Sequence, residues 1–251
     1  MPTHPTLPPA FAFISQVERF YAGLISAANP GPEPSLGGKL FYAGELDTAG
    51  RAMVVAANIA GAATLTASAD PMARKQAIRD GVVDFLVTSL DEALRILKNE
   101  LRQRQTVAVA VALAPGASEA DFAGEMRRRG VAPDLLRPAA AAEPPRSGNG
   151  REFLVAFSVP AAPARWLPKL DAMAADCLGP EDGQARRWLR LAPRYLGRLA
   201  QGMRLLRCNQ KAAANFAALA EQAQLGVAVE IFAPEGQSLD FPSGEPPAST
   251  G

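Results

Sequence analysis

The segment that decides the fold opens with Gly-Gly-Lys-Leu-Phe-Tyr-Ala-Gly at residues 37–44 and runs to residue 113. An apolar run, a helix of small residues and a second apolar run follow one another, and a third apolar run precedes a helical repeat of leucines. The segment ends in Val-Ala-Val-Ala-Val-Ala at residues 107–112, which is apolar throughout, as expected for a strand buried on both faces. Strands and helices that alternate in this order form a parallel sheet covered by helices. We therefore predict an α/β fold with a Rossmann-like parallel sheet and flanking helices.

Apolar periodicity and turn residues place the elements of this fold within residues 11–137, which we predict to be one Rossmann domain. We expect strands at residues 39–43, 63–67, 84–87, 107–113 and 132–136, the third of them short and buried. We expect helices at residues 11–28, 49–61, 72–80, 91–103 and 119–130. Ser89 and Ser118 stand directly before two of these helices, and Glu92 follows Ser89 at the third position, which is the pattern of an N-terminal cap.

The rest of the chain divides by composition. Residues 138–150 are rich in Ala, Pro, Ser and Gly and are predicted to be a linker or a loop. Residues 151–233 are predicted to form a mainly helical α/β part whose strands could extend the first sheet. In that part we expect strands at 153–159 and 227–232, helices at 164–176 and 209–224, and a helical segment at 184–211 that Pro193 must break or kink. We expect residues 1–10 and 234–251 to be disordered.

Composition excludes several classes of function. The chain has 251 residues, 48% of them hydrophobic and 20% charged, with a net charge of +1, so it suits a soluble globular protein without a strong pull toward nucleic acid or membrane. The only histidine, His4, lies in a proline-rich leader, which removes histidine triads and histidine metal sites. Cys177 and Cys208 form no CxxC motif, so we expect no metal site. With no targeting segment and no membrane span in sight, we expect a reduced, cytoplasmic protein.

The turn after the first strand is where a sheet of this kind would hold a dinucleotide. It reads Gly44-Glu45-Leu46-Asp47-Thr48-Ala49-Gly50-Arg51, and only its first and seventh residues are glycines that would allow close approach to a diphosphate. Glu45 and Asp47 bring two carboxylates to the place of the diphosphate, where like charges repel. Asp47 or Thr48 is also a suitable N-cap, so a capped turn that binds nothing is the favoured alternative.

Four stretches occur in an order that points to a family. They are Leu36-Gly37-Gly38-Lys39-Leu40, Ala56-Ala57-Asn58-Ile59-Ala60-Gly61-Ala62, Thr88-Ser89-Leu90-Asp91-Glu92-Ala93-Leu94 and Arg129-Gly130-Val131-Ala132-Pro133-Asp134. With them, residues 21–113, and onward to 136, resemble the NAD-binding domain of urocanase (urocanate hydratase). The resemblance covers about half the chain and implies a Rossmann-like domain that binds NAD in a lyase of histidine catabolism.

The resemblance also implies where the site should lie. It adds Arg79, at a basic position of the family, to the turn residues, so the candidate cofactor-binding residues are Gly44, Leu46, Asp47, Thr48, Gly50 and Arg79. The position for a ribose-binding carboxylate falls near Ser68, with Asp70 as a poor substitute. Residues 137–144 replace a polar active-site loop with alanines and prolines. Ala192-Pro193-Arg194-Tyr195-Leu196 resembles a stretch before the family's active-site cysteine, but residues 200–201 carry no thiol.

Two hypotheses follow from the sequence. The favoured one is a truncated urocanase-like protein that lacks hydratase activity on its own and acts as a binding or interaction module, with a protein partner or a second copy. The alternative is an NAD-dependent hydro-lyase, or a subunit of one, completed by a partner chain. We assign no catalytic residue and no metal. The arginines of residues 186–207 are interpreted as a solvated face, with an acidic partner as the alternative and nucleic acid disfavoured.

Overall fold

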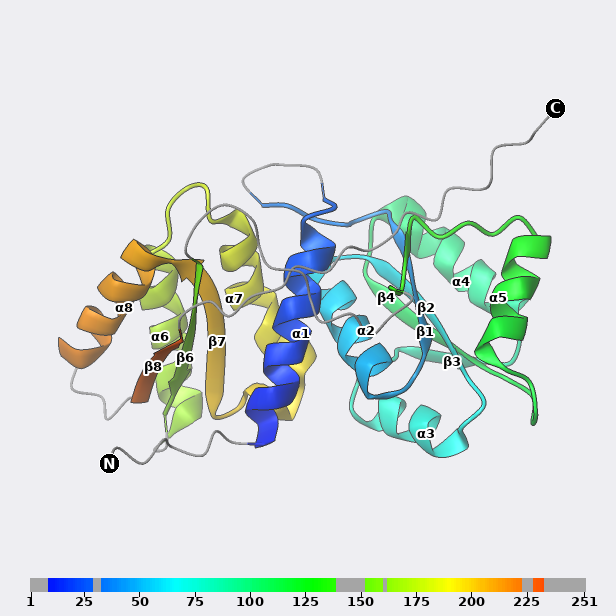
Figure 1. Ribbon diagram of the computed structural model, residues 1–251, viewed down its shortest axis with the longest axis horizontal. Coiled ribbons are helices and arrows are strands. Elements are labelled where there is room, and N and C mark those ends of the chain that lie inside the picture. The colour runs from blue at the N-terminus through cyan, green and yellow to red at the C-terminus, as the bar shows by residue number, and fades with distance from the viewer. Residues whose placement is uncertain (1–8, 29–32, 139–151, 160–161, 223–227, 233–251) are drawn as a thin grey trace.

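The computed structural model describes residues 9–28, 33–138, 152–159, 162–222 and 228–232. It consists of two α/β parts that lie side by side, with the first helix between them (Figure 1). The larger part holds a five-stranded sheet and the smaller part holds a separate three-stranded sheet. In the described part of the chain, no helix is both long and apolar enough to cross a membrane.

The five-stranded sheet is parallel throughout, as predicted. Its strands are β1 (Leu40–Glu45), β2 (Ala63–Ser68), β3 (Phe85–Val87), β4 (Val107–Ala112) and β5 (Leu135–Leu136), in the order β3-β4-β2-β1-β5. The helices of this part are α1 (Pro9–Ile25), α2 (Thr48–Ala60), α3 (Pro71–Arg79), α4 (Leu90–Gln103) and α5 (Glu119–Arg128). One buried cluster joins the sheet to α1 and α2, and another joins the opposite face to α4 and α5.

The alternation in β4 explains how the two faces are filled. Val107, Val109 and Val111 lie in the cluster with α4 and α5, while Ala108 and Ala110 lie in the cluster with α2. Branched side chains fill the space under α4 and α5, and small ones let the alanine-rich α2 approach the sheet closely. The Rossmann-like fold expected from the sequence is thereby confirmed.

Side-chain caps define where the helices of this part begin. Asp47 accepts a hydrogen bond from the Gly50 N–H at 2.6 Å at the start of α2, and Ser89 accepts one from the Glu92 N–H at 3.3 Å at the start of α4. Ser118 forms a full capping box with Asp121 at the start of α5. The predicted caps at Ser89 and Ser118 are confirmed because such signals depend only on neighbouring residues.

The prediction for β3 is wrong in one respect. The strand exists, but Phe85 and Leu86 are 47% and 45% exposed, so it is not buried. β3 lies at the edge of the sheet and pairs with β4 alone in the described sheet. Hydrophobicity of a short run does not distinguish a central strand from an edge strand, because that depends on strand order.

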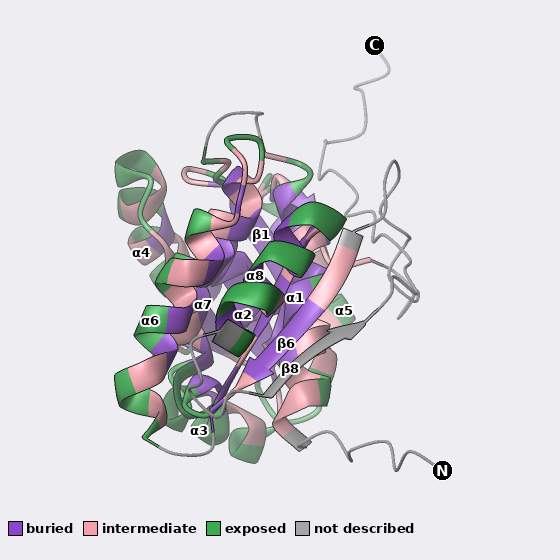
Figure 2. Ribbon diagram, turned by 90° about the vertical axis from the view of Figure 1, so that its left-hand side faces the viewer, coloured by how far each residue is buried: buried purple, intermediate pink, exposed green. Residues whose placement is uncertain are grey.

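The smaller part corrects two predictions. Its elements are β6 (Glu152–Ser158), α6 (Pro163–Asp176), α7 (Gly183–Leu196), a 3₁₀ turn (Gly197–Ala200), β7 (Met203–Asn209), α8 (Gln210–Gln222) and β8 (Ala228–Phe232). The strands form their own antiparallel sheet in the order β7-β6-β8 and do not extend the first sheet. Residues 203–209, expected to be helical, form β7, which is held to α7 by a 2.6 Å hydrogen bond from Trp188 Nε1 to the Leu205 carbonyl. Figure 2 shows exposed residues on the outer faces of α6 and α8 and buried residues along much of β6.

Helix α1 and helix α7 join the two parts through buried polar contacts. The Tyr21 hydroxyl donates to the Gln184 carbonyl at 2.8 Å, and Glu18 forms an ion pair with Arg207 of β7 at 2.6 Å. Arg187 is only 8% exposed and donates through Nε to the Ile59 carbonyl at 2.8 Å, at the C-terminal end of α2. Arg187 is therefore not part of a solvated arginine face, because its charge satisfies the negative end of α2.

Candidate functional site

The carboxyl ends of β1 and β5 form the candidate site. Strands β2, β3 and β4 all lie on one side of β1. From β4 the chain passes through α5 to β5, which lies on the other side of β1, so the strand order reverses between β1 and β5. In open parallel sheets, ligands bind in the crevice outside the strands at such a switch point. Glu45 and Asp47 stand at the end of β1, and Arg137 follows β5 directly. We call the surface formed by these three residues the β1/β5 crevice.

The two glycines of the turn are required by close contacts. Gly44 has φ of +70°, and a Cβ there would lie 3.1 Å from Cδ of Arg137. A Cβ on Gly50 would lie 1.9 Å from the carbonyl oxygen of Glu45, which is impossible without moving the backbone. The tight strand-to-helix turn of a nucleotide-type fold is thus retained in shape.

An ion pair lies across this turn. Arg137 Nη2 lies 2.8 Å from Asp47 Oδ2 and Nη1 lies 3.1 Å from Asp47 Oδ1, so the pair is bidentate. Arg137 Nη1 also donates to the Glu45 carbonyl at 3.2 Å. Asp47 is the N-cap of α2 as well, so a carboxylate of the chain itself occupies the positive end of the helix. A cation that could hold a diphosphate is present here, but it is already bonded.

The sequence alone did not identify Arg137 as a site residue. It was interpreted only as the start of an alanine-rich loop, because its contacts are to residues 90 and 92 positions away in the chain. The one signal that could have found it is its place directly after a strand that neighbours β1. That place is known only when the order of strands is known.

The other candidate residues are placed differently. Leu46 is 1% exposed and belongs to the core beneath α2, so it does not face the crevice. Thr48 is the exposed first residue of α2. Arg79 is exposed at the last residue of α3, and no hydrogen bond or ion pair links it to the other described residues. Its neighbour Asp80 pairs with Arg51 of α2, so the end of α3 comes close to the turn.

The end of β2 carries no carboxylate aimed at a ribose. Ser68 is fully buried, and its hydroxyl accepts a hydrogen bond from the Asp70 N–H at 3.2 Å. Asp70 is the N-cap of α3 and accepts from the Met72 N–H at 2.8 Å. Arg74 donates to the Ser68 carbonyl at 2.6 Å. The polar groups at this position therefore satisfy one another.

Tyr42 and Glu119 form a second polar pair beside the crevice. The Tyr42 hydroxyl donates to Glu119 Oε1 at 2.7 Å, at the first residue of α5. Burial, and then the hydrogen bond to Glu119, raise the pKa of Tyr42 well above its ordinary value. Tyr42 therefore stays protonated near neutral pH and acts as a hydrogen-bond donor, not as a base.

The Arg137–Asp47 pair predicts a pH dependence. Partial burial acts to raise the pKa of Asp47, but hydrogen bonds from Arg137 and the Gly50 N–H lower it overall below its ordinary value. A carboxyl whose folded-state pKa is depressed adds stability above its unfolded pKa of about 3.9 and loses it as pH falls through the folded pKa. As the pH falls below about 4, the free energy of unfolding, measured by chemical denaturation, should therefore decrease more for the wild type than for Asp47→Asn. Equal pH profiles for the two proteins would contradict this account of the pair.

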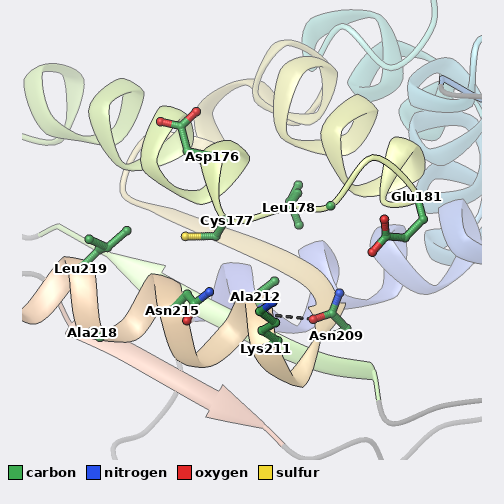
Figure 3. Close-up of a pocket in the computed structure, with 11 residues that line it drawn as sticks. Asp176, Cys177, Leu178, Glu181, Asn209, Lys211, Ala212, Asn215, Ala218 and Leu219 are labelled. Atoms are coloured by element: carbon green, nitrogen blue, oxygen red, sulfur yellow. Dashed lines mark hydrogen bonds between the residues drawn. The ribbon is translucent and has the colours of Figure 1, made fainter.

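A separate groove of about 540 Å³ lies in the smaller part, between the end of α6 and α8 (Figure 3). The Cys177 thiol points into it, opposite Asn215 and Leu219 of α8. Burial, and then the nearby Asp176, raise the pKa of Cys177, so it is a protonated thiol and a poor nucleophile near neutral pH. No disulfide joins it to Cys208. Within the described ranges, no group of three or more His, Cys, Asp or Glu residues could hold a metal ion.

Comparison with known families covers the part of the chain that contains the crevice. The sequence model described as the urocanase Rossmann-like domain matches residues 17–149, which is more than half of the chain. The chain belongs to the urocanase family. The match begins inside α1, includes the whole five-stranded sheet and ends beyond Arg137, while the smaller α/β part lies outside it. The family predicted from the ordered stretches is confirmed.

One curated relative is similar to about half of this chain. The S-methyl thiourocanate hydratase of Variovorax sp. (strain JCM 16519 / RA8) is 27% identical over 130 residues, which are 52% of this chain and 23% of the relative. The chain thus matches less than a quarter of that enzyme's length. Most of the relative has no counterpart in the match.

Proposed function

We propose that this protein is a urocanase-type Rossmann module that binds a partner or ligand and does not hydrate a urocanate-like substrate on its own. The observation that carries the proposal is the bidentate pair of Arg137 with Asp47 at the β1/β5 crevice. The Arg137 guanidinium and the N–H of Gly50 at the start of α2 could each bind a diphosphate, but both are already bonded to Asp47.

The groups around the crevice support the same proposal. NAD is the cofactor that the family implies, and the turn fits its diphosphate poorly, since Asp47 and Glu45 present two acidic side chains there. Tyr42 and Glu119 bond to each other. The two cysteines lie in the smaller part, and His4 lies outside the described residues. We therefore assign no catalytic step to the residues at the crevice.

An NAD titration tests the proposal. A ligand that binds the folded state raises the melting temperature. Because we expect the wild type to bind neither NAD nor inorganic pyrophosphate, both should leave its melting temperature unchanged. Asp47→Asn keeps an N-cap but removes the charge, and so frees Arg137 for an anion. We expect calorimetry to detect pyrophosphate binding to this variant, with an affinity at least about tenfold above any that the wild type shows.

A matched control is available on the opposite face of the sheet, between α4 and α5. Asp91 lies in the first turn of α4 and forms a two-point pair with Arg129, with N–O distances of 2.6 and 3.3 Å. Asp91→Asn removes a comparable ion pair away from the crevice and should leave anion binding unchanged. Micromolar binding of NAD by the wild type would refute the proposal.

The second candidate function is a hydro-lyase, or a subunit of one, completed by another chain. The retained turn geometry at Gly44 and Gly50 favours it, together with the relative's name and the small share of that relative that this chain matches. Loss of urocanate absorbance on adding the chain, alone or with proteins encoded next to it, would support this candidate. No change in absorbance under either condition would leave the module as the better account.

A further inference from the structure

The groove between α6 and α8 is large enough for a small molecule. Its volume of about 540 Å³ lies within the usual range of ligand pockets, roughly 300–1,000 Å³. One wall is the end of α6 with the turn that follows it, and the other wall is a single face of α8 (Figure 3). We call this cavity, which lies between residues 176–181 and 209–219, the α6/α8 groove. It lies outside the part of the chain that the urocanase domain matches.

The two ends of the groove differ in polarity. Figure 3 shows Glu181 and Asn209 at one end and Leu219 at the other, with Cys177 between them. Leu219 is 41% exposed, so its end of the groove presents an apolar surface to solvent. A cavity with a polar end and an apolar end fits a ligand that has a polar head and an apolar body.

Two opposite charges at the polar end are available to a ligand. In the described part of the chain, neither the Lys211 ammonium nor the Glu181 carboxylate forms an ion pair or a hydrogen bond. Asn209 is already engaged, because its Oδ1 accepts from the Ala212 N–H at 2.9 Å and its Nδ2 donates to Asp182 at 3.3 Å. The charged groups left at this end are therefore one cation and one anion.

The helix ends that form the groove carry charges that their own dipoles oppose. Acidic side chains are favourable in the first turn of a helix and basic ones in the last turn, and α4 and α5 follow this rule. Helix α6 instead ends on Asp176 without a base in its last turn, and α8 has Lys211 but no acid in its first turn. A local rule that is broken on both sides of one cavity indicates a binding site.

We propose that the α6/α8 groove binds a free α-amino acid with a large apolar side chain. The start of α8 and Lys211 bind the carboxylate, while the end of α6 and Glu181 bind the ammonium group. The apolar side chain extends along the groove toward Leu219. A ligand with only a carboxylate would be repelled by Glu181, and one with only an ammonium group would be repelled by Lys211. The two walls together therefore select a zwitterion.

Alkylation of Cys177 in the full chain tests binding at this place. L-Phenylalanine at about 10 mM should slow the reaction of Cys177 with iodoacetamide about fivefold or more, as expected for a dissociation constant of about 1 mM or lower. Mass spectrometry of the alkylated peptides measures the rate. Cys208 is 4% exposed and should stay unmodified, which shows that the protein remains folded. An alkylation rate of Cys177 that phenylalanine leaves unchanged would overturn the proposal.

Two fragments of phenylalanine test the need for both charges. 3-Phenylpropanoate keeps the ring and the carboxylate but lacks the ammonium group, and 2-phenylethylamine keeps the ring and the ammonium group but lacks the carboxylate. Each should protect Cys177 with an affinity at least about tenfold below that of phenylalanine, because each loses one charged contact and keeps one repulsion. Equal protection by either fragment would refute a site for a zwitterion.

Substitutions at the two charges test their roles. Lys211→Gln and Glu181→Gln should each lower the affinity for phenylalanine about fivefold or more. Glu221→Gln is the matched control, since Glu221 is an exposed acid in the last turn of α8 that does not line the groove, and it should leave the affinity unchanged. Wild-type affinity in either Lys211→Gln or Glu181→Gln would overturn the proposed contacts. None of these experiments involves the β1/β5 crevice, so their failure is separate from a failure of the proposed module function.

Discussion

Gly50→Ala is expected to lower the free energy of unfolding by about 3 kcal/mol, or the melting temperature by about 6–12 °C. The added Cβ would lie 1.9 Å from the Glu45 carbonyl oxygen and 3.0 Å from its carbonyl carbon, and both are backbone atoms. The turn and the first turn of α2 must therefore separate. That movement also disturbs the Asp47 cap, whose hydrogen bond comes from the Gly50 N–H.

Gly124→Ala is the matched control for this prediction. Gly124 lies inside α5, and the nearest atom to an added Cβ is Nη1 of Arg128 at 3.4 Å, at the end of a flexible side chain. Alanine there should stabilise the protein by about 0.5–1 kcal/mol, because it favours the helix and restricts the unfolded chain. Thermal unfolding followed by circular dichroism measures both variants. If Gly50→Ala melted within a degree or two of the wild type, the turn would not be as tight as described.

Glu18→Gln is expected to cost about 3 kcal/mol in the free energy of unfolding. The Glu18 side chain is 3% exposed and that of Arg207 is 17% exposed, with N–O distances of 2.6 and 2.7 Å. Removing the carboxylate charge leaves the guanidinium at a site where water cannot solvate it well. Because the pair joins α1 to β7, the cost appears at the contact between the two parts.

Glu33→Gln provides a comparison at the same contact. Glu33 pairs with Arg190 of α7, but the two side chains are 48% and 56% exposed. Its removal should cost less than about 1 kcal/mol, since exposed pairs gain little over solvation. Replacing the buried pair as a whole, by Glu18→Leu with Arg207→Met, should recover most of the stability lost in Glu18→Gln. Equal denaturation midpoints for Glu18→Gln and Glu33→Gln would contradict the proposed role of burial.

The elements that the sequence predicted well are those set by local chemistry. The caps at Ser89 and Ser118 and the apolar run of β4 depend on residues that are neighbours in the chain. β7 was missed because the arginine-rich helical pattern was extended through Met203–Asn209, although Gly197 and Gly202 stand before it as turn signals. What makes it a strand is pairing with β6, a contact across about 50 residues that no local pattern encodes.

The candidate site shows the same division at the turn that opens α2. The sequence by itself determined the strand, the tight turn and the acidic cap at Asp47, because each depends on a few consecutive residues. Only the tertiary structure decided that Arg137 closes the turn, that Arg187 is buried against α2, and that β3 lies at an open edge. These three outcomes depend on the order in which strands and helices pack. Packing order is set by the balance of burial and pairing over the whole chain, and no short stretch of sequence contains it.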